Sequence, residues 1–167
     1  MPTSKQPMMV IGVGGIGVIN GEHVGIKTFA LGSCVAVMLY DPVSGFVGMV
    51  HVALPCSQTN LQRACAMPGY FADTGVDELL KQASKARSGK RSKGYVVKVC
   101  GGASIIKSNA SFNIGERNCD AVMEHLARNG LRVSASDLGG TISRTVSIEK
   151  DTGHVLVSSP GRPSWGL

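Results

Sequence analysis

Several features that would define a protein class are scarce or missing in this sequence. Aromatic residues make up only 5% of the 167 residues, and the five cysteines include no C-x-x-C pair. Every apolar run is far shorter than the ~20 residues of a membrane-spanning helix, and the first residues lack the apolar stretch of a signal peptide. These absences argue against membrane insertion, a disulfide framework and a zinc site. We expect a soluble cytoplasmic protein with at least one free thiol, no metal and no cofactor.

Acidic residues are missing between Glu78 and Glu116, where eight Lys or Arg occur. The most basic part is the segment 81–98, whose positive charge could attract nucleic acid, an anionic membrane surface or an acidic protein. Only one aromatic residue, Tyr95, lies there, which disfavours stacking on single-stranded bases, so we expect no nucleic-acid partner. The simplest interpretation is a solvated helix end and loop that carries Lys85, Arg87, Lys90, Arg91 and Lys93.

The chain has enough apolar residues for one domain with a full core, at 43% hydrophobic and a net charge of +6. Apolar residues at helical spacing predict two helices, at 73–87 and 115–129. Runs of β-forming residues broken by glycine and proline predict strands at 26–31, 34–40, 46–54, 95–100, 131–136, 141–149 and 155–158. Strands before, between and after two helices indicate a layered α+β fold. We expect one domain over 1–158, followed by a loose tail at 159–167.

The segment Gly12–Gly17 matches the G-x-G-x-x-G pattern of dinucleotide-binding loops. That pattern binds pyrophosphate only where a helix begins directly after the loop. Here Gly21 and Gly25 follow closely and would break such a helix. The sequence therefore favours a flexible glycine-rich strand over a nucleotide site.

Cys34 and His51 come close together if the strands 34–40 and 46–54 form a hairpin. Paired residue numbers would then sum to 85–87, and a sum of 85 places the two side chains opposite each other. A thiol beside an imidazole is the smallest unit of cysteine nucleophilic catalysis, and the small residues Gly32 and Ser33 would leave backbone amides free for an oxyanion. The alternative is that Cys34 is a small buried residue and His51 a hydrogen-bonded core histidine.

Several blocks of the sequence resemble the CheD family of chemoreceptor glutamine deamidases. Two of them surround the cysteine and the histidine, at 27–41 (KTFALGSCVAVMLYD) and 48–55 (GMVHVALP). Further blocks lie at 70–80, 99–103 (VCGGA), 114–118 (IGERN), 137–140 (DLGG) and 153–157 (GHVLV). The resemblance extends over about residues 10 to 158, and the order and spacing of the blocks make it specific.

The resemblance implies a catalytic set of Cys34 as nucleophile, His51 as base and Thr28 six residues before the cysteine. It implies an α/β sandwich similar to the catalytic domain of cytotoxic necrotizing factor. The substrate would be a side-chain glutamine on the cytoplasmic helical bundle of a methyl-accepting chemoreceptor, and the phosphatase CheC would be a further partner. The basic segment 81–98 could then meet acidic receptor helices. We expect Gly32 and Ser33 to position the oxyanion or the substrate.

Two rival functions remain open at this point. The same thiolate chemistry would hydrolyse a receptor glutamate methyl ester instead of an amide. A non-enzymatic adaptor that binds and stimulates CheC is the other possibility. The matching Thr28, Cys34 and His51 argue against a purely binding role.

Overall fold

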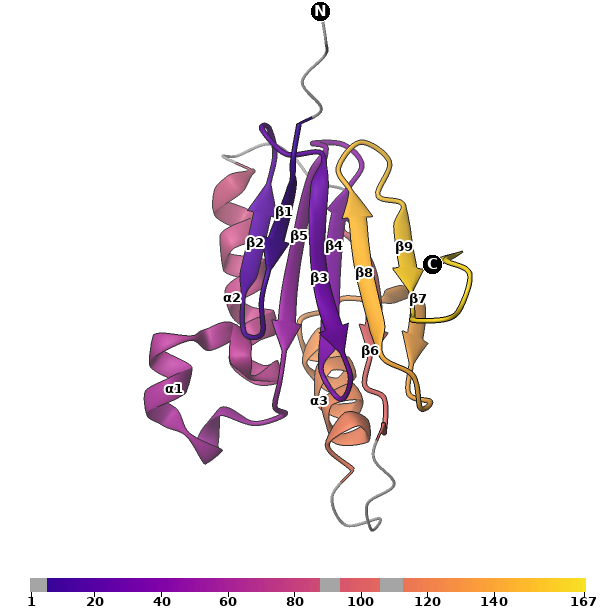
Figure 1. The fold of residues 1–167 in the computed structure, drawn as a ribbon. Coiled ribbons are helices and arrows are strands. Elements are labelled where there is room, and N and C mark those ends of the chain that lie inside the picture. Colours follow the sequence, from indigo (N-terminus) through magenta and orange to yellow (C-terminus); the bar gives the residue numbers. More distant parts are fainter. Residues whose placement is uncertain (1–5, 88–93, 106–112) are drawn as a thin grey trace, which may run out of the picture.

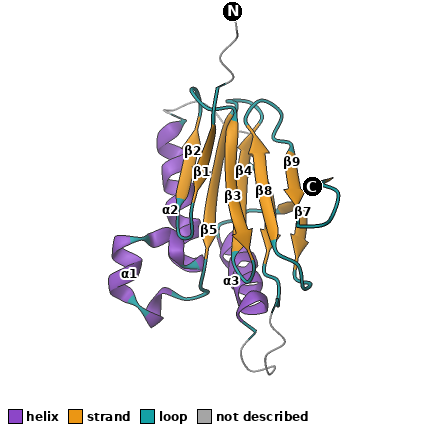
Figure 2. Cartoon of the chain, in the orientation of Figure 1, coloured by secondary structure: helices purple, strands orange, loops and turns teal. Residues whose placement is uncertain are grey.

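The computed structural model describes residues 6–87, 94–105 and 113–167, which form two five-stranded sheets and a layer of helices (Figures 1 and 2). The first sheet has the strand order β1 (Met8–Ile11), β3 (Gly25–Leu31), β8 (Arg144–Glu149), β9 (Val155–Ser158) and β10 (Trp165–Gly166). The second has the order β2 (Ile16–Ile19), β5 (Phe46–Val52), β4 (Val35–Asp41), β6 (Val96–Gly101) and β7 (Val133–Leu138). The two sheets lie face to face and share a hydrophobic core.

The long helices α2 (Ala72–Ala86) and α3 (Ile114–Arg128) cover the outer face of the second sheet, behind the strands in Figure 1. Strand β6, helix α3 and strand β7 form a parallel β-α-β crossover, which places α3 on this face. The short helix α1 (Leu61–Ala66), flanked by the 3-10 turns Ser57–Thr59 and Pro68–Tyr70, lies to one side of the sheets in Figure 1.

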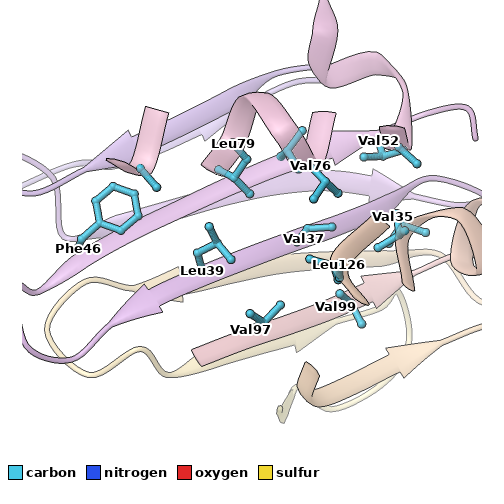
Figure 3. Close-up of a cluster of buried hydrophobic side chains, with 14 residues drawn as sticks. Val35, Val37, Leu39, Phe46, Val52, Val76, Leu79, Val97, Val99 and Leu126 are labelled. Atoms are coloured by element: carbon cyan, nitrogen blue, oxygen red, sulfur yellow. The ribbon is translucent and has the colours of Figure 1, made fainter. Parts of the chain in front are cut away.

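The second sheet is buried on both faces, and its central strands divide their side chains between two cores. Alternate residues of β4 point to opposite faces, as the period of a strand requires. One face packs on α2 and α3 through Val37, Leu39 and their neighbours, with Val76 and Leu126 among the helix contacts (Figure 3). The other face packs on the first sheet and includes Met38. The space between the two sheets also contains the side chains of the candidate site.

The predicted helices and most predicted strands are confirmed, with ends within a few residues of the expected positions. The fold is α+β, as expected. Four elements lie outside the predicted ranges: β1, β2, β10 and α1. Each spans at most six residues, too few to show a strand or helix period.

The expected loose tail at 159–167 is instead fixed to the domain. Trp165 and Gly166 pair with β9, and the Trp165 indole N–H donates to Asp137 Oδ2 at 2.7 Å. The Lys98 ammonium donates to the Leu167 carbonyl at 2.5 Å. Proline and glycine in this tail predicted a loop, but an aromatic anchor and a short strand order it.

The basic segment 81–98 is only partly described, since Lys90, Arg91 and Lys93 lie outside the described residues. Arg87 packs over the Tyr95 ring at 4.9 Å and lies 3.7 Å from the buried Asp41 carboxylate. Lys98 contacts the C-terminal residue, as described above. These two cations therefore stabilise the domain itself, which weakens the expectation that the whole segment faces an acidic partner.

Candidate active site

The chain crosses from the first sheet to the second between Thr28 on β3 and Cys34 just before β4. A bulge interrupts the pairing of β3 after Thr28, and Ala30 adopts a left-handed conformation with φ 56°. Such a conformation is rare for a residue with a side chain, and bulges often re-aim side chains next to active sites. The crossing places Thr28 and Cys34 on the facing surfaces of the two sheets.

The β4–β5 hairpin has a different register from the one that would place Cys34 directly opposite His51. His51 pairs with Ala36 and Val52 with Val35, so paired numbers sum to 87 rather than 85. The turn contains four residues, 42–45, because the Asp41 carboxylate accepts from the Val43 amide at 2.9 Å. A shift of two residues keeps the side chains of Cys34 and His51 on the same face, as diagonal neighbours.

His51 is completely buried, and its imidazole is held by Thr28 from the opposite sheet. The Thr28 hydroxyl lies 2.7 Å from His51 Nδ1 and 2.8 Å from the Ile11 carbonyl oxygen. A hydroxyl has a single proton, and the carbonyl can only accept it, so Nδ1–H must donate to Thr28. Nε2 is then the unprotonated nitrogen, and it has no partner among the described residues. The geometry fixes the tautomer in which Nε2 can act as a base.

The glycine-rich segment 12–17 was expected to be a strand, but only its last two residues belong to one, β2, and the rest forms a tight turn against the backbone of His51. The Gly14 amide donates to the His51 carbonyl at 2.8 Å, and the His51 amide donates to the Gly15 carbonyl at 3.1 Å. Gly14 has φ 75°, which favours glycine. The residues after it form β2 rather than a helix, so the helix N-terminus of a dinucleotide-binding loop is not formed here.

Burial sets the ionisation of both side chains. It lowers the pKa of His51 to about 4 and raises the pKa of the Cys34 thiol, although the Cys34 backbone amide partly lowers it. Both shifts favour the neutral form, as removal from water does. The resting pair is therefore a thiol and a neutral imidazole rather than an ion pair.

The buried imidazole predicts a loss of stability at acidic pH. Between the pKa of about 4 in the folded state and the ordinary value of 6.5, the unfolded chain binds a proton at His51 and the folded chain does not. The free energy of unfolding is therefore highest above pH 6.5 and falls as the pH drops, with a contribution of about 3 kcal/mol lost by pH 4. Urea denaturation at both pH values measures this loss. Acidic residues also titrate in this range, so an equal loss in His51→Asn would contradict the assignment.

The loop 32–34 is held by its carbonyl groups. The Gly32 carbonyl accepts from the Ala103 amide, and the Cys34 carbonyl accepts from the Gly102 amide, both at 2.8 Å. The Ser33 carbonyl accepts from the Asn118 side chain at 2.9 Å. No described backbone carbonyl accepts from the Ser33 or Cys34 amide.

Glycines next to this loop allow its close packing on β6 and α3. A side chain at Gly101 would meet the Cys34 carbonyl oxygen at 2.2 Å, and one at Gly102 would meet Cys119 Sγ at 2.1 Å. A side chain at Gly115 would meet the Ala103 carbonyl at 2.5 Å. The Gly-Gly pair and the start of α3 are therefore required for the position of the cysteine loop.

The structure brings Thr28, His51 and Cys34 to one end of the space between the sheets, with Gly32 and Ser33 beside them. Sequence reasoning assigned no role to the fully buried Asn118, which also donates to the Ala53 carbonyl at 3.0 Å. The only sequence signal for Asn118 was its place in the block 114–118, one of those that resemble the CheD family. All five cysteines are free thiols.

Neither a cluster of metal ligands nor a membrane-spanning helix occurs in the part of the chain that the structure describes. No three His, Cys, Asp or Glu side chains in 6–87, 94–105 and 113–167 are grouped as metal ligands would be. No helix in the same ranges is long and apolar enough to cross a membrane.

Comparison with known proteins identifies close relatives. A family model described as CheD chemotactic sensory transduction matches residues 53–159. A protein of Syntrophotalea carbinolica named "Probable chemoreceptor glutamine deamidase CheD" is 46% identical over 95% of this chain and 98% of its own length. A Symbiobacterium thermophilum protein of the same name is 39% identical over 95% of this chain and 96% of its own. The "Chemoreceptor glutamine deamidase CheD" of Thermotoga maritima is 40% identical over 91% of this chain and 92% of its own.

Proposed function

This chain belongs to the CheD family, and from that we propose that it is a chemoreceptor glutamine deamidase with Cys34 as its nucleophile. The observation that carries the catalytic assignment is the contact between Thr28 and His51, which leaves Nε2 unprotonated and without a hydrogen-bond partner in the part of the chain that the structure describes. A buried structural histidine would instead have both ring nitrogens satisfied.

The proposed reaction has two halves. His51 Nε2 takes the Cys34 proton as sulfur attacks the side-chain amide carbon of a receptor glutamine, and a tetrahedral oxyanion forms. The C–N bond breaks, the imidazolium returns the proton to nitrogen, and ammonia leaves a thioester on Cys34. Water then gives a proton to His51 and attacks the thioester, which releases glutamate and restores the thiol.

We propose that the Ser33 and Cys34 amides stabilise the oxyanion, with Gly32 leaving room for the substrate. Support comes from the loop 32–34, where the three carbonyls accept hydrogen bonds and neither of these two amides donates to a described backbone carbonyl. Aligned N–H groups in a site that excludes water stabilise developing negative charge strongly.

The substrate class, partners and location follow from the same family membership. We propose the cytoplasmic domain of chemoreceptors as the substrate, CheC as a further partner, and the cytoplasm as the location. Five free cysteines, including the exposed Cys65, suit a reducing compartment.

Incubation with the cytoplasmic fragment of a chemoreceptor from the same organism tests the function. Ammonia release, matched by conversion of identified glutamines to glutamates in mass spectra, is the expected result. Methanol release from a methylated fragment without ammonia would replace the deamidase by a methylesterase. Binding without either product would leave the adaptor function.

The role of Thr28 gives a separate prediction. Thr28→Val keeps the shape of the side chain but removes the acceptor for His51 Nδ1–H, so the other tautomer becomes accessible. The deamidation rate is expected to fall by about 10-fold to 100-fold, the effect of one or two lost hydrogen bonds. Thr28→Ser restores the hydroxyl and is the matched control. Full activity in Thr28→Val would show that the threonine does not orient the imidazole.

A further inference from the structure

Asn118 links the nucleophile loop to the strand that carries the base. It lies on the first turns of α3 and is fully buried. Its side-chain nitrogen donates to the Ser33 carbonyl at 2.9 Å and to the Ala53 carbonyl at 3.0 Å. Ser33 immediately precedes Cys34, and Ala53 follows His51 by two residues. One carboxamide therefore connects the two parts of the chain that the proposed chemistry needs.

The two contacts fix the orientation of the carboxamide. Both partners are carbonyl oxygens, which only accept, so the nitrogen must face them. The other atom, Oδ1, is buried without a hydrogen-bond partner among the described residues. A buried polar atom without a partner costs free energy, so Asn118 is a costly choice for a purely packing position. Val122, one turn later on the same face, fills its position with an apolar side chain.

The contact with the Ser33 carbonyl also determines the direction of the next amide. The peptide group between Ser33 and Cys34 is planar and trans, so its N–H points away from its C=O. A carbonyl drawn toward α3 therefore turns the Cys34 N–H away from α3. The neighbouring carbonyls of Gly32 and Cys34 are held by Ala103 and Gly102. Of the three described hydrogen bonds to the carbonyls of Gly32, Ser33 and Cys34, only the one from Asn118 comes from a side chain.

We propose that Asn118 is a positioning residue that orients the Ser33–Cys34 peptide group so that the Cys34 amide faces the oxyanion. This inference rests on the proposed deamidase function and deepens it. Asn118 acts through the backbone and contacts neither the substrate nor the thiol. It should therefore matter to the tetrahedral transition state much more than to substrate binding.

The test compares Asn118→Leu and Asn118→Asp with the wild-type chain. Both variants keep the branched side chain of four heavy atoms and lose the amide donor. We expect kcat for deamidation to fall about 100-fold and KM to stay within about threefold. Alkylation of Cys34 by iodoacetamide, followed on the Cys34 peptide by mass spectrometry, should stay within about threefold of wild type because this displacement forms no oxyanion.

Val122→Ala is the matched control because it weakens α3 at a buried position of the same face without touching the loop. It should keep kcat within about threefold when assayed well below its melting temperature. Wild-type kcat in Asn118→Leu would overturn this inference and leave the proposed function intact. An equal loss of alkylation and deamidation would also overturn it, since Asn118 would then hold the thiol rather than the amide. Absence of ammonia release by the wild-type chain would overturn the proposed function and this inference together.

Discussion

Replacement of Cys34 by alanine is expected to reduce ammonia release from a chemoreceptor fragment to background, a loss of at least about 10⁴-fold. Without the sulfur no thioester forms, so the proposed reaction stops before its first step. The side chain is only partly buried, so its loss should change the stability little. Ammonia assay and thermal denaturation of the same preparation measure both effects.

Cys56→Ala is the matched control, because Cys56 is a free, partly buried thiol outside the site. It should retain the wild-type rate. Ammonia release by Cys34→Ala at more than a small fraction of the wild-type rate would remove Cys34 as the nucleophile. If Cys34→Ala lost deamidation but still stimulated CheC phosphatase, the chain would have both the enzymatic and the adaptor role.

The neutral resting pair has a consequence for thiol chemistry. Burial raises the pKa of Cys34 and lowers that of His51, so little thiolate exists before substrate binds. The thiol must therefore be deprotonated by His51 during attack, as in general-base catalysis. A substrate amide docked over the site would remove further water and strengthen this coupling.

The long elements of the fold were predictable because their signals are local. Helix α2 buries Val76, Leu79 and Ala83 at helical spacing, and β4 follows the expected run of β-forming residues. Thr74 and Asp77 have the spacing of a helix capping box, which would place the helix start after Thr74. Helix α2 starts at Ala72, and the Thr74 hydroxyl donates to the Pro68 carbonyl instead. The position of a helix cap depends on the path of the chain before the helix, and the local sequence does not specify that path.

The site itself was predictable only in part. The hairpin brought Cys34 and His51 to one face, but the four-residue turn after Asp41 shifted the register by two residues. The approach of Thr28 to His51 depends on how two sheets stack, and no spacing within one strand specifies that. The buried donor of Asn118 is equally remote, since 85 residues separate it from Ser33. Such contacts between distant segments required either the structure or the family resemblance.

His51→Asn is expected to lower the deamidation rate by about 10³-fold while the fold is retained. The asparagine amide can occupy the position of Nδ1 and donate to the Thr28 hydroxyl, so the contact at 2.7 Å has a substitute. Nothing replaces Nε2, and the thiol then loses its base. In His51→Gln, the longer side chain reaches the position of Nε2 instead and leaves the Thr28 hydroxyl without a donor.

The pH dependence of kcat/KM distinguishes a catalytic base at His51 from a structural histidine. The base must be neutral to accept the Cys34 proton, so wild-type kcat/KM should fall on the acid side only near pH 4, the pKa that burial gives His51. The residual activity of His51→Asn should lack this acid limb, and its stability should lose less between pH 6.5 and pH 4 than that of wild type. An unchanged acid limb in His51→Asn would assign the titration to another group. Wild-type activity in that variant would make His51 a core residue held by Thr28.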